Sequence, residues 1–448
     1  MLRDDSSLDH VTPYDRFASG DTLIEEWLAS GARRRELSDY FGPVEYRGLA
    51  ALARHARATQ VRAGAPRVLI VPGIMGSQLG LARAAPLPND ILWLVPLDIQ
   101  RGRLSALRVP AAAPIVPLGV VLFSYLRLKL YLRAHGFAAE FHDYDWRLPL
   151  GHSGGALAAK LRALRPARVA IVAHSMGGLV SRAALALAGT HHVERLVLLG
   201  TPNCGSFAAV QALRGTYAVV LKVARLAQQA SAESLAAEIF STFPSLYELL
   251  PSGSCGAVGA DLFDARCWPA AGPQPHAKLL AAARAAQQQL EAPDERFAVI
   301  AGVGAETVTA VRRGGEEFVY TLTRGGDGTV PVSSAVLAGV PSAYARVAHS
   351  DLTRDRVVAA AVVDLLLSGR TRRLPARWVS TARASAQVSD GQLRRMHAEK
   401  VDWAALTAVE RRLFLETLNE PPHLRLRVPH GARHPRKGRP PQKTQRKK

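Results

Sequence analysis

Short, continuous apolar runs recur along the chain and alternate with segments whose apolar residues fall at helical spacing. The runs occupy residues 68–71, 138–142, 168–173, 193–199 and 297–303. Such runs predict strands that are covered on both faces, as in a parallel sheet between layers of helices. We therefore expect an α/β fold with a doubly wound, mostly parallel sheet.

The segments between the runs complete this pattern. Helical spacing is clear over residues 21–28, 47–57 and 118–135. Later in the chain, residues 307–312 and 317–323 flank the turn Arg313-Gly314-Gly315-Glu316, which predicts a β-hairpin.

Ser175 stands where the third apolar run passes directly into helical spacing, in the sequence Ala173-His174-Ser175-Met176-Gly177-Gly178. A serine on such a sharp turn needs nearly side-chain-free neighbours two positions before and after it, because the backbone is strained there. Ala173 and Gly177 meet this requirement, although glycine is usual at the first position. The pattern predicts a nucleophile elbow. A plain strand-to-helix turn with a serine N-cap is the alternative.

Four other motifs resemble one family. They lie at residues 71–79 (VPGIMGSQL), 144–147 (YDWR), 200–206 (GTPNCGS) and 325–331 (GGDGTVP). Together with the elbow they resemble the lecithin:cholesterol acyltransferase family, serine α/β-hydrolases that move acyl groups from phospholipids and related esters. The resemblance covers roughly residues 67–367 and implies an α/β-hydrolase fold. A glycine turn of a nucleotide-binding fold is the alternative at the first motif, but G-x-G-x-x-G is lacking.

The resemblance also implies roles for single residues. The N–H of Ile74 would be one oxyanion donor, and the N–H of Met176, directly after the serine, would be the second. Trp93 would lie near the substrate mouth, unless it is simply a buried tryptophan. Asp145 and Arg147 can form an ion pair that supports the loop.

A serine nucleophile needs a base within hydrogen-bond reach and a carboxylate that orients the base. Asp327, in a glycine-rich loop, and His349 follow Ser175 in the chain order of α/β-hydrolases. Asp351 comes after the histidine, and Asp294 precedes the strand that should carry the acid. The sequence therefore predicts the triad Ser175, Asp327 and His349. The alternatives are a turn aspartate and a surface histidine.

The long insertion at about 203–270 interrupts the alternation of strands and helices with apolar, helical sequence. It must lie on the carboxyl face of the sheet, above Ser175. We expect a lid, because a lipid substrate needs an apolar roof that excludes water. A packed helical subdomain without motion is the alternative. Candidate contacts with an acyl chain include Phe240 and Phe243, together with Val219, Val220, Leu221 and Ile239.

The net charge of +20 is concentrated at the C-terminus. Residues 423–448 contain ten Lys or Arg and no acid, so this tail is expected to be disordered. Its charge fits contact with an anionic membrane surface, or a merely solubilising end. No aromatic residue interleaves the basic residues, which does not favour nucleic acid as a partner.

Cysteines and hydropathy bear on the compartment. The three cysteines have no metal-site spacing, and Cys255 with Cys267 could form at most one bridge, so a reducing compartment is the simpler expectation. No signal-peptide pattern opens the sequence, and no stretch looks able to span a bilayer; residues 111–126, with two prolines, predict a buried loop and a helix start. We expect a cytoplasmic protein that can associate with the surface of a membrane. It is expected to lack the signal peptide and the lid-loop cysteine pair of the secreted family members.

These observations predict a serine acyltransferase or lipase acting on lipid esters such as glycerophospholipids, with water or an alcohol as acceptor and without metal or cofactor. A carboxylesterase for small esters and an inactive scaffold that binds a membrane or partner are the alternatives. The expected organisation is a helical N-terminal extension, an α/β-hydrolase domain, a helical C-terminal extension and a basic tail, over residues 1–62, 63–370, 371–422 and 423–448.

Overall fold

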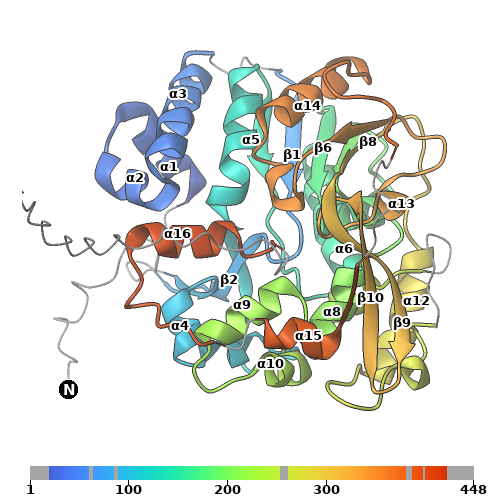
Figure 1. The fold of residues 1–448 in the computed structure, drawn as a ribbon. Helices are drawn as coiled ribbons and strands as arrows, with labels where there is room; N and C mark the ends of the chain where they lie inside the picture. The colour runs from blue at the N-terminus through green and yellow to red at the C-terminus, as the bar shows by residue number, and fades with distance from the viewer. Residues whose placement is uncertain are drawn as a thin grey trace, which may run out of the picture.

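A six-stranded parallel sheet forms the centre of the computed structural model, in the order β11-β8-β7-β6-β1-β5 (Figure 1). The structure describes residues 20–59, 64–84, 89–252, 261–379, 386–396 and 399–420. Every neighbouring pair in this sheet is parallel. The strands are β1 (Arg67–Val71), β5 (Ala138–Phe141), β6 (Val169–His174), β7 (Val193–Leu199), β8 (Phe297–Gly302) and β11 (Ser342–Ala345).

Helices cover this sheet, which explains why its strands are continuous apolar runs. All but the first residue of β1 and all but the second of β6 are buried. The helices that alternate with the strands are α5 (Leu122–Ala134), α6 (Leu150–Ala163), α7 (Met176–Leu185), α12 (Ala277–Gln288) and α14 (Arg356–Ser368). The predicted doubly wound α/β sheet is confirmed.

The strand order changes direction at β1, which lies between β5 and β6 although β5 and β6 both follow it in sequence. In open α/β sheets, ligands bind at the carboxyl ends of the strands where the order reverses. The loops after β1 and β6 meet at this point. They carry Ile74 and Ser175, respectively.

Two antiparallel sheets flank the central one. The first has the order β3-β2-β4 and contains β2 (Ser77–Leu81), β3 (Asp90–Trp93) and β4 (Val116–Val120). The predicted hairpin is confirmed as β9 (Ala305–Gly314) and β10 (Glu317–Gly326), and β12 (Ala386–Ser389) adds to it in the order β12-β10-β9.

Two expectations need correction here. β4 lies within residues 111–126, where a loop and a helix start were expected; its backbone pairs with β2, and helix α5 begins only at Leu122, after Gly119 at φ 108°. The segment after residue 371 is not purely helical, because β12 completes the edge of β10. In both cases the pairing partner is distant in sequence.

Helices at the two ends of the chain pack on the core. Helices α1 (Asp21–Ser30), α2 (Arg34–Phe41) and α3 (Pro43–Thr59) gather beside α5 (Figure 1), where Arg127 donates to Glu45 at 2.6 and 2.9 Å. At the other end, α16 (Ala408–Glu416) packs on α2, and α15 (Asp390–Arg395) packs on β10 and β12. The basic tail lies outside the described residues.

The insertion after β7 is built of short helices. These are α8 (Phe207–Leu213), α9 (Ala218–Leu226), α10 (Ala232–Glu238), η3 (Phe240–Thr242), α11 (Pro244–Glu248) and η5 (Ala265–Cys267). The remaining short helices are α4 (Pro96–Gln100), η2 (Arg103–Leu107), α13 (Val332–Ala335) and η6 (His349–Asp351).

One stretch of the insertion differs from the expectation that no segment is apolar enough to span a bilayer. Residues Phe207–Leu226 are long and apolar enough to cross a membrane by length and composition, but 83% of that window is buried inside the fold. Burial on this scale is typical of the core helices of a globular protein, which pass the same test.

Candidate active site

Ser175 occupies a strained turn between β6 and α7. Its backbone has φ 54° and ψ −129°, a conformation that costs a non-glycine residue on the order of 1–3 kcal/mol. A Cβ atom at Gly177 would lie 2.4 Å from the carbonyl oxygen of Pro72, so no side chain fits there. Ala173 is fully buried, and its single methyl group is accommodated. The local sequence thus forms the predicted elbow.

The structure brings the three predicted triad side chains together. Ser175 Oγ donates to His349 Nε2 at 2.9 Å, and His349 Nδ1 donates to Asp327 Oδ2 at 2.8 Å. The other carboxylate oxygen of Asp327 accepts from the N–H groups of Thr329 and Val330 at 3.0 and 2.7 Å. All three triad side chains are buried.

Asp327 reaches the site from outside the central sheet. It directly follows β10 of the hairpin, while His349 follows β11 at the edge of the central sheet. The two loops are joined because His349 N donates to Asp327 O at 2.9 Å. Gly302 at the end of β8 makes room, since a Cβ atom there would lie 2.5 Å from the Cβ of Asp327.

The two predicted oxyanion donors lie on either side of the serine. Ile74 is in the loop after β1, and Met176 is the first residue of α7. This loop approaches the elbow closely, because a Cβ atom at Gly73 would lie 2.8 Å from the Cβ of Ser175. Within the described part of the chain, neither the Ile74 nor the Met176 N–H donates a backbone hydrogen bond. Both therefore remain candidates for binding an oxyanion.

Tyr125 is a site residue that sequence reasoning missed. Its hydroxyl accepts from Gly73 N at 2.9 Å and donates to His174 Nδ1 at 3.0 Å, and His174 Nε2 donates to the carbonyl of His349 at 3.0 Å. This chain ties the oxyanion loop to the residue that carries the base. Nothing in the sequence marks a tyrosine inside a helix for this role.

His174 stays neutral in this arrangement. Burial, with the neighbouring His349 ring as a smaller cause, holds the pKa of His174 well below its usual value. Its neutral form has one donor nitrogen and one acceptor nitrogen, and both are used. The interpretation of His174 as a hydrogen-bonded structural residue is confirmed.

The three aromatic residues expected to contact substrate are packed in the core instead. Trp93, Phe240 and Phe243 are each at most 1% exposed. Trp93 donates to Met75 O at 3.0 Å and packs edge-on against Trp146, which in turn packs against Phe243. In this conformation none of the three is accessible to a ligand, because each is buried in the core. Their contact with substrate stays a prediction that requires the insertion to move.

The loop after β5 behaves as expected. Asp145 and Arg147 form a buried bidentate pair with distances of 2.9 and 2.6 Å, and Trp146 donates to Ser77 O at 3.0 Å. These contacts fix the loop beside β2. They place none of its side chains in contact with Ser175.

The structure answers whether Cys255 and Cys267 pair, which the sequence left open. Cys204 is disulfide-bonded and Cys267 is a free thiol, so Cys267 does not form a bridge with Cys255. Residue 255 lies outside the described residues.

The parallel sheet, the elbow after β6 and the later acid and base loops define an α/β-hydrolase fold. The hydrogen-bonded serine, histidine and aspartate have the geometry found in serine hydrolases.

Comparisons with known proteins agree with this class. A family described as "PGAP1-like alpha/beta domain" matches residues 152–241, which include Ser175 but neither Asp327 nor His349. A search of curated proteins finds no match. The family match fits an α/β-hydrolase domain and does not single out the lecithin:cholesterol acyltransferase family.

Solved structures with similarity to the chain have low sequence identity. The Tle4–Tli4 complex contains a chain that is 15% identical, with a TM-score of 0.48, covering 67% of this chain and 98% of that one. The mature form of Bacillus licheniformis lipase BlEst2 is 16% identical, with a TM-score of 0.35, covering 68% and 92%. Its propeptide form is 17% identical, with a TM-score of 0.36, covering 72% and 53%.

Proposed function

We propose that this protein is a serine-dependent enzyme that cleaves lipid esters through an acyl-enzyme intermediate. The observation that carries the proposal is the continuous hydrogen-bonded chain from Ser175 through His349 to Asp327, at a serine held in a strained elbow. Strained backbone at a buried, hydrogen-bonded serine is typical of a nucleophile and is costly for a merely structural turn.

The chemistry follows from the geometry. Ser175 Oγ attacks the ester carbonyl carbon while His349 Nε2 takes the hydroxyl proton, and the N–H groups of Ile74 and Met176 bind the oxyanion. The tetrahedral intermediate collapses, the ester C–O bond breaks, and His349 gives its proton to the departing alkoxide. A water or an alcohol then attacks the acyl-enzyme with the same proton transfers in reverse.

A lipid ester is the substrate class that the insertion favours. The side chains of Val219, Val220 and Leu221 on α9 are buried, and the helices of the insertion pack beside the hairpin that carries Asp327. An apolar roof of this kind suits a long acyl chain once the insertion moves aside. Small esters remain the alternative, and they need no such roof.

We further propose that the acyl-enzyme transfers its acyl group to an alcohol. Ser175 and His349 are each 6% exposed, and a dry site slows hydrolysis of an acyl-enzyme relative to transfer to a bound alcohol. The motifs that resemble the lecithin:cholesterol acyltransferase family support the same reaction. Glycerophospholipid as the acyl donor, a cytoplasmic location and contact of the basic tail with an anionic membrane rest on sequence alone.

A fluorophosphonate probe tests the proposal. Wild-type protein should be labelled, and the Ser175→Ala variant should not, because the probe reacts only with an activated serine hydroxyl. Matching thermal melts of the two proteins would exclude misfolding as the cause. Folded wild-type protein that resists the probe would refute the proposal and favour an inactive scaffold.

Two substrate series refine the result. p-Nitrophenyl esters of increasing chain length should give a rising kcat/KM for a lipid-ester enzyme and a flat or falling one for a small-ester hydrolase. With a labelled phospholipid and an added alcohol, a labelled ester product would support acyl transfer, while free fatty acid alone would leave a lipase.

A further inference from the structure

The oxyanion loop, residues 72–76, does not hold its shape by itself. It connects β1 to β2 and is neither helix nor strand. Met75 in this loop has φ 62°, a left-handed conformation that is costly for a residue with a side chain. Such a conformation persists only where the surrounding structure fixes it. The contacts that fix this loop therefore bear on the donor that it carries, Ile74.

Two buried tyrosine hydroxyls hold one peptide group of the oxyanion loop, the one that joins Pro72 to Gly73. Tyr144 Oη donates to Pro72 O at 2.8 Å, and Tyr125 Oη accepts from Gly73 N at 2.9 Å. The C=O and N–H of a trans peptide point in opposite directions, so the two hydroxyls fix this peptide from both sides. We call these two hydroxyls the tyrosine clamp.

The next peptide group, between Gly73 and Ile74, carries the predicted oxyanion donor. Its carbonyl oxygen, on Gly73, accepts from Gly76 N at 3.0 Å, whereas the Ile74 N–H makes no backbone hydrogen bond in the described part of the chain. Only the two backbone torsions of Gly73 separate this peptide from the clamped one, and glycine restricts these torsions least of all residues. The direction of the Ile74 N–H therefore depends on the tyrosine clamp.

The oxyanion loop is packed tightly between the clamp and the elbow. A Cβ atom at Gly76 would lie 2.8 Å from the hydroxyl oxygen of Tyr125, and a Cβ atom at Gly73 would lie 2.8 Å from the Cβ of Ser175. Neither glycine leaves room for a side chain. A shift of the Tyr125 hydroxyl would thus be passed on to the loop.

The directions of the hydrogen bonds on the Tyr125 side are determined by the groups at the two ends. The Gly73 N–H can only donate, and the carbonyl of His349 can only accept. Because His174 is neutral, its Nε2 carries the proton that goes to His349 O, and its Nδ1 accepts from the Tyr125 hydroxyl. Burial raises the pKa of Tyr125, so its hydroxyl keeps the proton that this chain requires.

Helix α5 is also joined directly to the segment that follows the base. Thr353 Oγ1 donates at 2.7 Å to the carbonyl of Ser124, the residue before Tyr125. One turn of α5 therefore contacts both the oxyanion loop and the segment after His349. On the other side, burial raises the pKa of Tyr144 well above its usual value, which keeps that hydroxyl a donor.

We propose that Tyr125 and Tyr144 are positioning residues for the oxyanion donor: their hydroxyls clamp the peptide that precedes the Gly73–Ile74 peptide and so align the Ile74 N–H. This inference rests on the proposed function. The tyrosines act through the loop and do not contact the reacting atoms. A donor that is aligned in advance stabilises the transition state without reorganising during the reaction.

Removing the two hydroxyls one at a time tests this assignment. With p-nitrophenyl butyrate as substrate, Tyr125→Phe should lower kcat about 30-fold, a part of the roughly 10²- to 10³-fold that loss of a whole oxyanion donor costs. Tyr144→Phe should lower kcat about tenfold, because Tyr125 still holds the N–H end of the clamped peptide. KM should stay within about twofold in both variants, since the oxyanion forms only in the transition state.

A tetrahedral inhibitor gives a second readout. A short alkyl trifluoromethyl ketone accepts Ser175 Oγ at its carbonyl carbon, and the carbonyl oxygen becomes an oxyanion as in the reaction. Its Ki should rise in each variant by about the factor by which kcat/KM falls, because both depend on the same donor. A loss of stability alone moves neither quantity in protein that stays folded.

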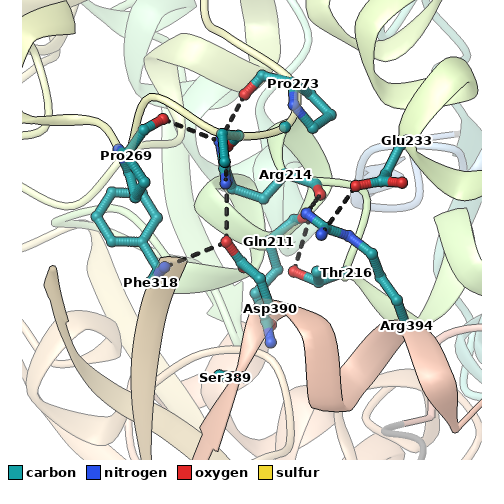
Figure 2. A network of polar contacts seen from close by, with 12 residues as sticks. Gln211, Arg214, Thr216, Glu233, Pro269, Pro273, Phe318, Ser389, Asp390 and Arg394 are labelled. Atoms are coloured by element: carbon teal, nitrogen blue, oxygen red, sulfur yellow. Dashed lines mark hydrogen bonds and ion pairs between the residues drawn. The ribbon is translucent and has the colours of Figure 1, made fainter. Parts of the chain in front are cut away.

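Tyr320→Phe is the matched control. Tyr320 is also a buried tyrosine, and its hydroxyl donates to Asp390 at 2.6 Å. Asp390 belongs with Arg214 to the polar network that Figure 2 shows, which includes none of the triad residues. This variant should lower the melting temperature at least as much as the other two but should keep kcat and Ki within about twofold of wild type. All assays are run well below the lowest melting temperature.

The outcomes separate the two proposals. Wild-type protein that the fluorophosphonate probe labels, with both clamp variants at wild-type kcat and Ki, overturns the clamp and leaves the serine enzyme intact. An equal loss of kcat in Tyr320→Phe also overturns the clamp, since any buried hydroxyl would then serve. If Tyr125→Phe does not fold, the result for Tyr144→Phe decides alone. Wild-type protein that is not labelled overturns the proposed function, and the role of the clamp falls with it.

Discussion

Two buried aspartates, Asp327 and Asp390, are compensated in different ways. Asp327 accepts from two backbone N–H groups and from His349, whereas Asp390 accepts from a backbone N–H, a tyrosine hydroxyl and the guanidinium of Arg214. Arginine is always charged, while an imidazole becomes charged only when it takes a proton. The first aspartate is therefore set up to stabilise a charge that appears during reaction, and the second holds a permanent charge inside the fold.

A third buried carboxylate sharpens the contrast. Glu248 of α11 accepts from Leu150 N at 2.6 Å, at the beginning of α6, and no ion pair to it is found among the described residues. Burial raises the pKa of Glu248 to about 7, with the Leu150 N–H as the smaller, opposing cause. Without a cation close by, a buried carboxyl favours its neutral form.

The largest expected effect is on activity, at Asp327. Asp327→Asn should lower kcat by about 10⁴-fold, because an amide no longer fixes the tautomer of His349 or stabilises its charged form. The melting temperature should change little. Ester hydrolysis and thermal melting, measured side by side, check both parts. A large loss of stability with a modest loss of activity would show that Asp327 has a structural role like that of Asp390.

The next effect is on stability, at Asp390. Asp390→Asn should destabilise the fold by about 3–5 kcal/mol, since it leaves the guanidinium of Arg214 buried without a counter-charge. Urea unfolding followed by tryptophan fluorescence measures the loss. Asp264→Asn is the control: its pair with Arg266 is exposed, and its removal should leave the unfolding midpoint unchanged. An equal shift in both variants would contradict the buried role.

The smallest of the three expected effects is on the pH dependence of folding stability, at Glu248. Its pKa is higher in the folded state than its usual 4.5, so the folded protein binds the proton more tightly than the unfolded chain. The stability that the proton provides is fully present below about pH 4.5 and is lost as the pH rises through about 7, with a total of about 3 kcal/mol.

Glu248→Gln should therefore be more stable than wild type at pH 8 and should match it near pH 5. Unfolding free energies of the two proteins at several pH values test this. Parallel pH profiles would show that another group is responsible.

The features that the sequence determined by itself are local. The elbow at Ser175 requires a small residue and a glycine at fixed offsets. No larger residue fits at position 177, because its side chain would clash with the carbonyl of Pro72. The apolar runs of β1 and β6 predicted a sheet buried on both faces. Chain order singled out Asp327 and His349 from many other acids and histidines. Each of these rests on a few neighbouring residues, whose chemistry is visible before folding.

The other features were decided by tertiary structure alone, because they depend on contacts between residues that are far apart in sequence. The pairing of Asp390 with Arg214 and the contact of Tyr125 with His174 have no local signature. The edge strands β4 and β12 likewise form because a partner strand offers free backbone groups, not because of their own propensity. The free energies of burial and of pairing that stabilise these contacts arise only when the chain has folded.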